Sequence, residues 1–135
     1  MSKYYLKADY DIQSLKFRKT EDTIVVDIPM LSHGKLNYGL EHVKTLLRSH
    51  NIFPSELGFD ILTLATMVYL ADTRIKRLIH GQDSWTREIV IQLPVSNVDL
   101  WNKQVKTVER MLKFLTGDLW GIEFVERNWP FELNE

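Results

Sequence analysis

The chain has 135 residues, no cysteine and a formal net charge of −1 at pH 7. Its hydrophobic fraction of 44% and charged fraction of 26% are typical of a globular domain that buries a core without disulfides. The missing cysteines exclude a catalytic thiol and a thiolate metal site, and the low net charge provides no global field that would attract nucleic acid. No signal-peptide pattern and no apolar run of membrane-spanning length is present. We therefore expect one cytoplasmic domain over residues 1–135, with no membrane contact.

Short β-prone runs dominate the beginning of the chain. Residues 3–8 and 14–18 are two such runs, and residues 23–28 form a stronger strand pattern with several β-branched side chains. We expect these three runs to form a small antiparallel sheet or meander. Pro29 ends the third strand, and residues 29–37 have the composition of a loop.

Two helices are predicted next. Residues 38–49 form a short helix, and a longer central helix begins at about residue 54 or 58 and extends to residue 79. The apolar residues of the central helix that share one face are Ile61, Leu64, Ala65, Val68, Ala71, Ile75, Leu78 and Ile79. Further apolar positions widen this face, so we predict that the central helix is covered on more than one side.

The remaining elements alternate between strand and helix. Residues 85–95 form a strand in which Arg87 falls on the otherwise apolar side. A helix capped at Ser96 or Asn97 follows and ends before Gly117, and residues 119–125 form the last strand. The helix face comprises Trp101, Val105, Val108, Leu112 and Leu115, extended by Met111. The order predicts an α+β fold in which a small, largely antiparallel sheet packs against two or three helices.

Known catalytic patterns are absent from the sequence. It contains no HExxH, GxGxxG or GxSxG motif, and its four histidines are scattered. Asp60 and Asp72 lie on the central helix about 18 Å apart by helix rise, which is too far for a shared substrate bond. We therefore predict no catalytic residue, no metal site and no cofactor for this chain.

A local basic cluster surrounds the end of the central helix and the strand that follows. Its cations are Arg74, Lys76, Arg77, His80 and Arg87, and Trp85 is close in sequence. Arginine beside tryptophan is common in surfaces that bind anions, bases or proteins, although cations at a helix C-terminus also complement the helix dipole. Asp72 could pair with Lys76 or orient a nearby arginine. The candidate binding residues selected from this region are Asp72, Arg74, Arg77, Trp85 and Arg87.

A second basic group lies on the polar side of the following helix. It consists of Lys103, Lys106, Arg110 and Lys113. Such a group is typical of a solvated helix face.

A scattered pattern in the second half of the chain resembles a known family. Its residues are Asp60-Ile61-Leu62, Val68-Tyr69-Leu70-Ala71-Asp72, Arg77, Trp85-Thr86-Arg87-Glu88-Ile89, Leu93-Pro94-Val95, Trp101, Phe114-Leu115-Thr116-Gly117-Asp118-Leu119-Trp120 and Phe124. This pattern resembles the N-terminal region of QueC-like (7-cyano-7-deazaguanine synthase-like) proteins of bacterial antiphage defence systems. In those relatives a nucleotide-activating domain with a Ser-Gly-Gly-x-Asp loop follows. The present chain has no such loop, so that chemistry is not transferred to it.

The resemblance implies a non-catalytic accessory or recognition module, as the N-terminal domain of a longer protein or as a stand-alone relative. The module would bind a partner protein, or help to frame a site for a small anionic or nucleotide-like ligand. Two alternatives belong to other classes: a nucleic-acid-binding domain that uses the basic helix faces, and a small enzyme in which Asp72 and Arg87 are the first candidates. A homodimer formed through uncovered strand edges is a further alternative.

Overall fold

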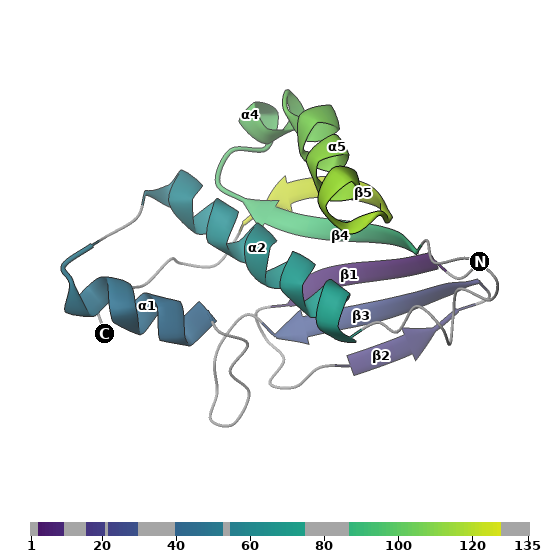
Figure 1. The fold of residues 1–135 in the computed structure, drawn as a ribbon, viewed down its shortest axis with the longest axis horizontal. Coiled ribbons are helices and arrows are strands. Elements are labelled where there is room, and N and C mark those ends of the chain that lie inside the picture. Colours follow the sequence, from purple (N-terminus) through teal and green to yellow (C-terminus); the bar gives the residue numbers. More distant parts are fainter. Residues whose placement is uncertain are drawn as a thin grey trace.

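The computed structural model describes residues 3–9, 16–20, 22–29, 40–52, 55–74 and 87–127. Within these ranges the chain forms one five-stranded sheet with helices α2 and α5 lying across one face (Figure 1). The strands are β1 (Lys3–Asp9), β2 (Lys16–Lys19), β3 (Thr23–Pro29), β4 (Glu88–Val95) and β5 (Leu119–Glu126). The helices are α1 (Leu40–Ser49), α2 (Glu56–Arg74), α4 (Val98–Asn102) and α5 (Val105–Thr116).

The sheet is mixed, with the strand order β2-β3-β1-β4-β5. β1 is parallel to both of its neighbours, β3 and β4, and β5 is parallel to β4, whereas β2 alone is antiparallel to its partner β3. The α+β class is confirmed, but the prediction of a largely antiparallel sheet is wrong. The connections that run through helices return the chain to the same end of the sheet, so β3, β4 and β5 point in one direction. β2 instead runs back along the outer side of β3, which separates it from β1.

One face of the sheet and the inner faces of the helices enclose the core. The strands alternate, so that paired residues such as Leu6, Val26 and Ile91 point to the same side and are almost completely buried. The helices contribute Leu64, Met67, Leu70, Ala71, Trp101 and Leu112 to this core. Side chains on the opposite face, including Lys3, Tyr5 and Lys7, are only half-buried. Helices α2, α4 and α5 therefore pack on the apolar side of the sheet.

Local sequence signals account for several helix ends. The Ser55 hydroxyl accepts a hydrogen bond from the Gly58 N–H at 3.1 Å, so α2 begins at Glu56, within the predicted range. Gly117 has a left-handed backbone (φ 78°), and its N–H donates to the Lys113 carbonyl, which confirms its role at the end of α5. The helix predicted after Asn97 is in fact two helices, α4 and α5, so the described residues contain four helices rather than two or three.

Candidate functional site

The candidate basic cluster is only partly contained in the described structure. Arg77 and Trp85 lie outside the described residues, and Arg74 is the last residue of α2. Asp72 and Arg87 are described, and the Arg87 Nη2 donates to Asp72 Oδ1 at 3.0 Å. The expectation that Asp72 orients an arginine is therefore confirmed for Arg87. The full cluster remains a prediction.

Arg87 belongs to the interior of the molecule, since only 2% of its surface is exposed. Its Nη2 also donates to Asp118 Oδ2 at 2.6 Å, its Nη1 donates to the Ala71 carbonyl at 3.1 Å, and its backbone N–H donates to Asp118 Oδ1 at 3.0 Å. Burial lowers the pKa of Arg87, but hydrogen bonds and negative charge from Asp118 and Asp72 outweigh that effect and raise the pKa above its ordinary value. The guanidinium thus joins the C-terminal part of α2 to the residues that precede β4 and β5.

A second buried arginine holds the other end of α2. Arg127 follows β5, and its side chain donates to Asp60 Oδ1 at 2.5 Å and to Glu56. The fully buried Asp60 also accepts hydrogen bonds from the Ser96 N–H and hydroxyl and from the Trp101 indole N–H at 3.0 Å. Burial lowers the pKa of Arg127. No local sequence pattern indicates this network, because its partners are up to 71 residues apart.

These two networks fix the position of α2 on the sheet. Arg87 and Asp118 lie immediately before β4 and β5, whereas Ser96 and Arg127 lie immediately after them. Each end of α2 is therefore bound to one end of the same strand pair. The buried carboxylates Asp60 and Asp118 both accept several hydrogen bonds within these networks, which is the arrangement expected of structural anchors.

An open groove of about 350 Å³ lies between α2 and α5. Its lining consists of Ile61, Leu64, Ala65, Val68, Tyr69 and Asp72 from α2, and of Met111, Leu112 and Thr116 from α5. Leu64 and Leu112 are buried, whereas Ile61 and Tyr69 are 52% and 60% exposed. The prediction that α2 is covered on more than one side is therefore wrong for the face that borders this groove.

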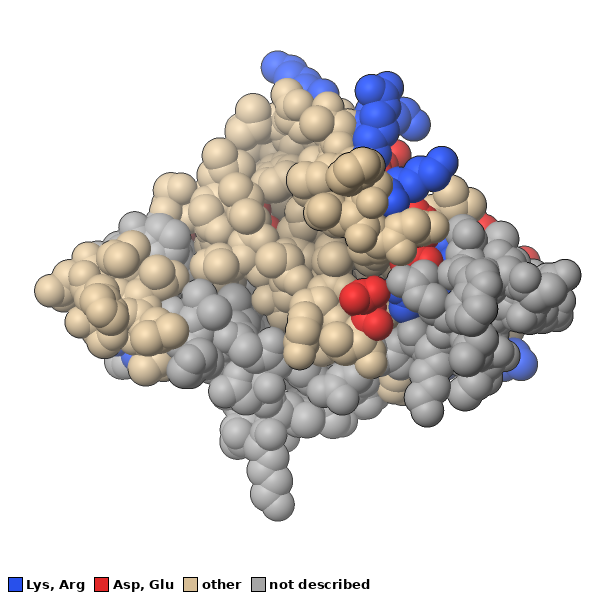
Figure 2. Space-filling model, in the orientation of Figure 1, with Lys and Arg blue, Asp and Glu red and all other residues tan. Residues whose placement is uncertain are grey.

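Exposed apolar side chains continue from the groove over α5. Met111 is 47% exposed, Leu115 is 68% exposed and Phe114 is 89% exposed. We call the groove together with Phe114 and Leu115 the α2–α5 surface. In Figure 2 most of the described residues on this side of the molecule are tan, that is, neither Lys, Arg, Asp nor Glu. Exposed apolar side chains that gather beside a groove make this surface a candidate for partner binding.

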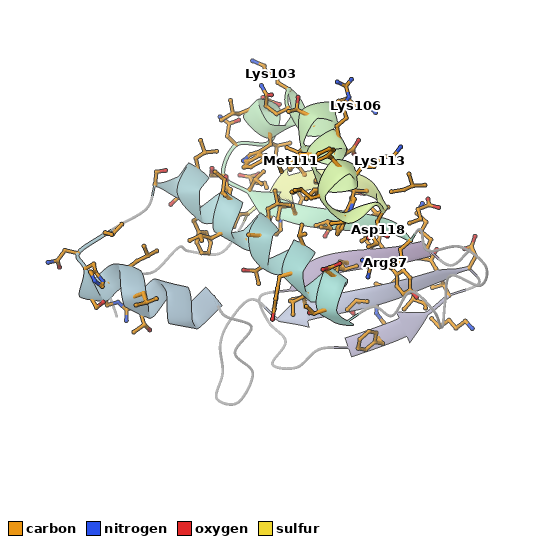
Figure 3. All side chains as sticks on the ribbon, in the orientation of Figure 1. Arg87, Lys103, Lys106, Met111, Lys113 and Asp118 are labelled. Atoms are coloured by element: carbon orange, nitrogen blue, oxygen red, sulfur yellow. The ribbon has the colours of Figure 1, made fainter. Side chains whose placement is uncertain are left out.

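Lys106 and Lys113 of the second basic group project from the side of α5 opposite Met111, and so away from the groove (Figure 3). Lys103, Lys106, Arg110 and Lys113 are all exposed, and Lys106 forms only a long ion pair with Glu109, at 3.9 Å. Figure 3 shows that the labelled lysines project outward from α5 and from the turn before it, whereas Arg87 and Asp118 lie together near the sheet. Of the two basic groups, the second therefore carries exposed cations, whereas Arg87 of the first is buried.

The described residues show no site built for a metal ion. No group of three or more His, Cys, Asp or Glu side chains could hold one in the part of the chain that the structure describes. None of the described helices is both long enough and apolar enough to cross a membrane. The most distinctive surface feature of the described structure is thus the apolar groove between α2 and α5, with the exposed apolar side chains of α5 beside it.

Comparisons with known proteins give no relative for this chain. No protein-family model, no curated protein and no solved structure matches it.

Proposed function

We propose that this chain is a recognition domain that binds a partner protein through the α2–α5 surface. The observation that supports the proposal is the open groove of about 350 Å³, whose walls include the exposed side chains Ile61, Tyr69 and Met111. Burial of such side chains by a partner releases water from apolar surface, which favours association. Buried anchors at both ends of α2 hold one wall of this groove in place before a partner arrives, and that reduces the entropy cost of binding.

The proposed binding site is the α2–α5 surface and not the local basic cluster that includes Arg87. Arg87 is buried and bonded to Asp118 and Asp72, so direct contact with a partner would require this network to open. Asp72 belongs to both regions, because it binds Arg87 and also lines the groove. Of the described candidate binding residues Asp72 and Arg87, Asp72 is therefore the one that lines the groove.

Photo-crosslinking in cells of the source organism tests the proposed function. A photoreactive amino acid replaces Tyr69 in the groove or, as a matched control, Lys7 on the opposite face of the sheet. We expect one specific protein adduct from position 69, loss of this adduct when Ile61→Arg is added, and no such adduct from position 7. Equal capture from both positions, or capture that Ile61→Arg does not change, contradicts the proposal.

The QueC-like resemblance suggests one host for such a recognition domain. A nucleotide-activating enzyme with a Ser-Gly-Gly-x-Asp loop would use the domain to hold a partner in antiphage defence. This assignment is a proposal that rests on the sequence pattern alone. Reading the coding sequence downstream of Glu135 tests it: an open frame that reaches such a loop supports the assignment, and a stop codon directly after Glu135 argues for a stand-alone domain.

A further inference from the structure

Strand β5 forms one edge of the sheet. Within the described ranges β4 is the only strand that pairs with β5, and the pairing is parallel. The N–H of Leu119 donates to the carbonyl of Arg87 at 2.9 Å, which begins the ladder toward β4. Backbone groups alternate in direction along a strand, so those of the even-numbered residues from 120 to 124 point away from β4. An outer edge of this kind is a template for pairing with another strand.

A side chain already occupies one position on the outer edge of β5. The N–H of Ile122 donates to Oε2 of Glu109 in α5 at 3.0 Å. The carboxylate oxygen takes the place of the carbonyl that a neighbouring strand would offer at this position. Exchange of one hydrogen-bond acceptor for another changes the free energy little, so an added strand can displace Glu109 through rotation of its side chain.

Two exposed lysines flank Glu109 along α5. Lys106 precedes it by three residues, with Nζ 3.9 Å from Glu109 Oε1, and Lys113 follows it by four residues. Residues at these spacings share one side of a helix, so both lysines lie on the side of α5 that meets the β5 edge. In Figure 3 they point away from Met111, and so away from the groove. Two cations beside one carboxylate leave this side of α5 positively charged.

We propose that the outer edge of β5 binds an extended, acidic segment of a partner protein as an additional strand of the sheet. The backbone of this segment pairs with residues 120–124, and its acidic side chains lie against Lys106 and Lys113. Successive side chains of a strand point to opposite faces, so the acidic residues occupy alternate positions. The edge is separate from the α2–α5 groove, and the proposal does not depend on the function proposed above.

A second copy of this chain is a poorer occupant of the edge. Pairing of two β5 strands around a twofold axis would bring the α5 lysines of both copies close together. Pairing of β5 with the opposite edge of another sheet would bring these lysines near β2, whose exposed cations include Arg18 and Lys19. Charge complementarity therefore favours an acidic partner over both arrangements.

Synthetic peptides of about eight residues, within the usual length of a strand, provide the probe. They alternate threonine with either glutamate or lysine, and NMR spectra of the full chain follow their binding. We expect the glutamate peptide to bind about tenfold more tightly than the lysine peptide at low salt. The double variant Lys106→Glu/Lys113→Glu should reverse this preference. Lys19→Glu, at the opposite edge of the sheet, is the matched control and should leave it unchanged.

Two further measurements test strand pairing itself. N-methyl groups on alternate residues remove the donors along one side of a strand, so one alternate set should weaken binding of the glutamate peptide at least about tenfold and the other set should not. The amide hydrogens of residues 120 and 124 should exchange more slowly in the complex. Glu109→Ala frees the Ile122 N–H and removes a negative charge, so it should tighten binding about threefold.

Several outcomes overturn the proposal. Equal binding of both peptides, failure of both to bind up to about 1 mM, or binding that neither N-methylated set weakens shows that β5 does not pair with an acidic strand. Binding of single-stranded DNA that is lost in Lys106→Glu/Lys113→Glu, without binding of the glutamate peptide, assigns the lysines to nucleic acid. Dimerisation that protects the same amide hydrogens assigns the edge to a second copy. Ile61→Arg should leave peptide binding unchanged, so failure at the edge is distinguishable from failure at the groove.

Discussion

Arg87 precedes β4 and shares the buried side of that strand with Ile89 and Ile91. In the sequence it looks like a binding residue next to Trp85, because cations are seldom buried. Its burial depends on Asp118, a carboxylate that the turn between α5 and β5 supplies from 31 residues away. The alternation of residues 85–95 placed Arg87 on the otherwise apolar side of the strand, but only the fold shows that its side chain is an internal anchor.

The burial of Arg87 leads to a stability prediction. We expect Arg87→Ala to lower the free energy of unfolding by about 3–5 kcal/mol, because it leaves the carboxylate of Asp118 buried without its guanidinium partner. Urea denaturation measures this change. Lys3→Ala is the control, because it removes an ion pair with Glu88 in which both side chains are 43% exposed, and it should change stability little. Equal effects of the two substitutions would contradict the anchoring role of Arg87.

Tyr4 provides a pH-dependent test of the same core. Burial raises the pKa of Tyr4 to about 12, although the positive charge of Arg87 acts in the opposite direction. The folded protein then holds the phenolic proton more tightly than the unfolded chain, whose tyrosine has a pKa of about 10. The resulting stabilisation is fully present below pH 10 and is lost as the pH rises from about 10 to 12. Its size is on the order of 2–3 kcal/mol.

Urea titrations of the wild type and of Tyr4→Phe at a series of alkaline pH values measure this effect. Lysines also titrate in this range, so the informative quantity is the difference in unfolding free energy between the two proteins. We expect Tyr4→Phe to lose less stability than the wild type as the pH rises from 10 to 12. Parallel curves for the two proteins would show that Tyr4 ionises equally in both states.

At the scale of elements, α2 is held by two separate anchors. Arg127 binds Asp60 near the start of the helix, and Arg87 binds Asp72 and the Ala71 carbonyl near its described end. Each anchor joins α2 to a different end of β4 and β5. Loss of one anchor should therefore loosen only one end of α2.

Amide hydrogen exchange tests whether the anchors act independently. We expect Arg127→Ala to raise exchange rates in the first turns of α2, around residues 59–64, and Arg87→Ala to raise them around residues 67–71. Mass spectrometry of overlapping peptides resolves the two segments. A uniform increase along α2 in both variants would show instead that the helix opens as a single unit.

Elements with a local signal could be predicted, whereas their pairing could not. The strand of residues 119–125 and the helix end at Gly117 follow from alternation and from a glycine that accepts a left-handed backbone, and both are confirmed. β1 pairs directly and in parallel with β3 although β2 lies between them in the sequence, and no local pattern encodes that pairing. The contact between Asp60 and Arg127 could not be predicted for the same reason, because only the fold brings the two side chains together.

The groove was missed for a related reason. Helical periodicity placed Ile61, Leu64, Ala65 and Val68 on one face, and the structure does place these residues along the groove side of α2. Periodicity shows which residues share a face but not how much of that face another element covers. Leu64 is buried whereas Ile61 and Ala65 are exposed, so the predicted core face is divided between the interior and the surface.

At the scale of the whole molecule, the described helices leave an apolar surface on their outer side. Leu112 and Leu115 lie on the same helix, α5, but Leu112 is 4% exposed and Leu115 is 68% exposed. A residue that serves the core contributes to the free energy of unfolding through the contacts that it buries. A residue whose exposed side chain contacts only a partner contributes little to the free energy of unfolding until the partner is bound.

Matched substitutions in α5 separate these two roles. We expect Leu112→Ala to lower the free energy of unfolding by about 2–5 kcal/mol, because it opens a cavity in the core. Phe114→Gln and Leu115→Gln should each change the free energy of unfolding by less than about 0.5 kcal/mol, and should weaken the crosslinking of position 69 to its partner. Urea denaturation measures the change in stability, and the crosslinking yield at position 69 measures the change in partner binding. A large loss of stability in Leu115→Gln would place that residue in the core, whereas unchanged crosslinking in both exposed variants would confine the binding site to the groove itself.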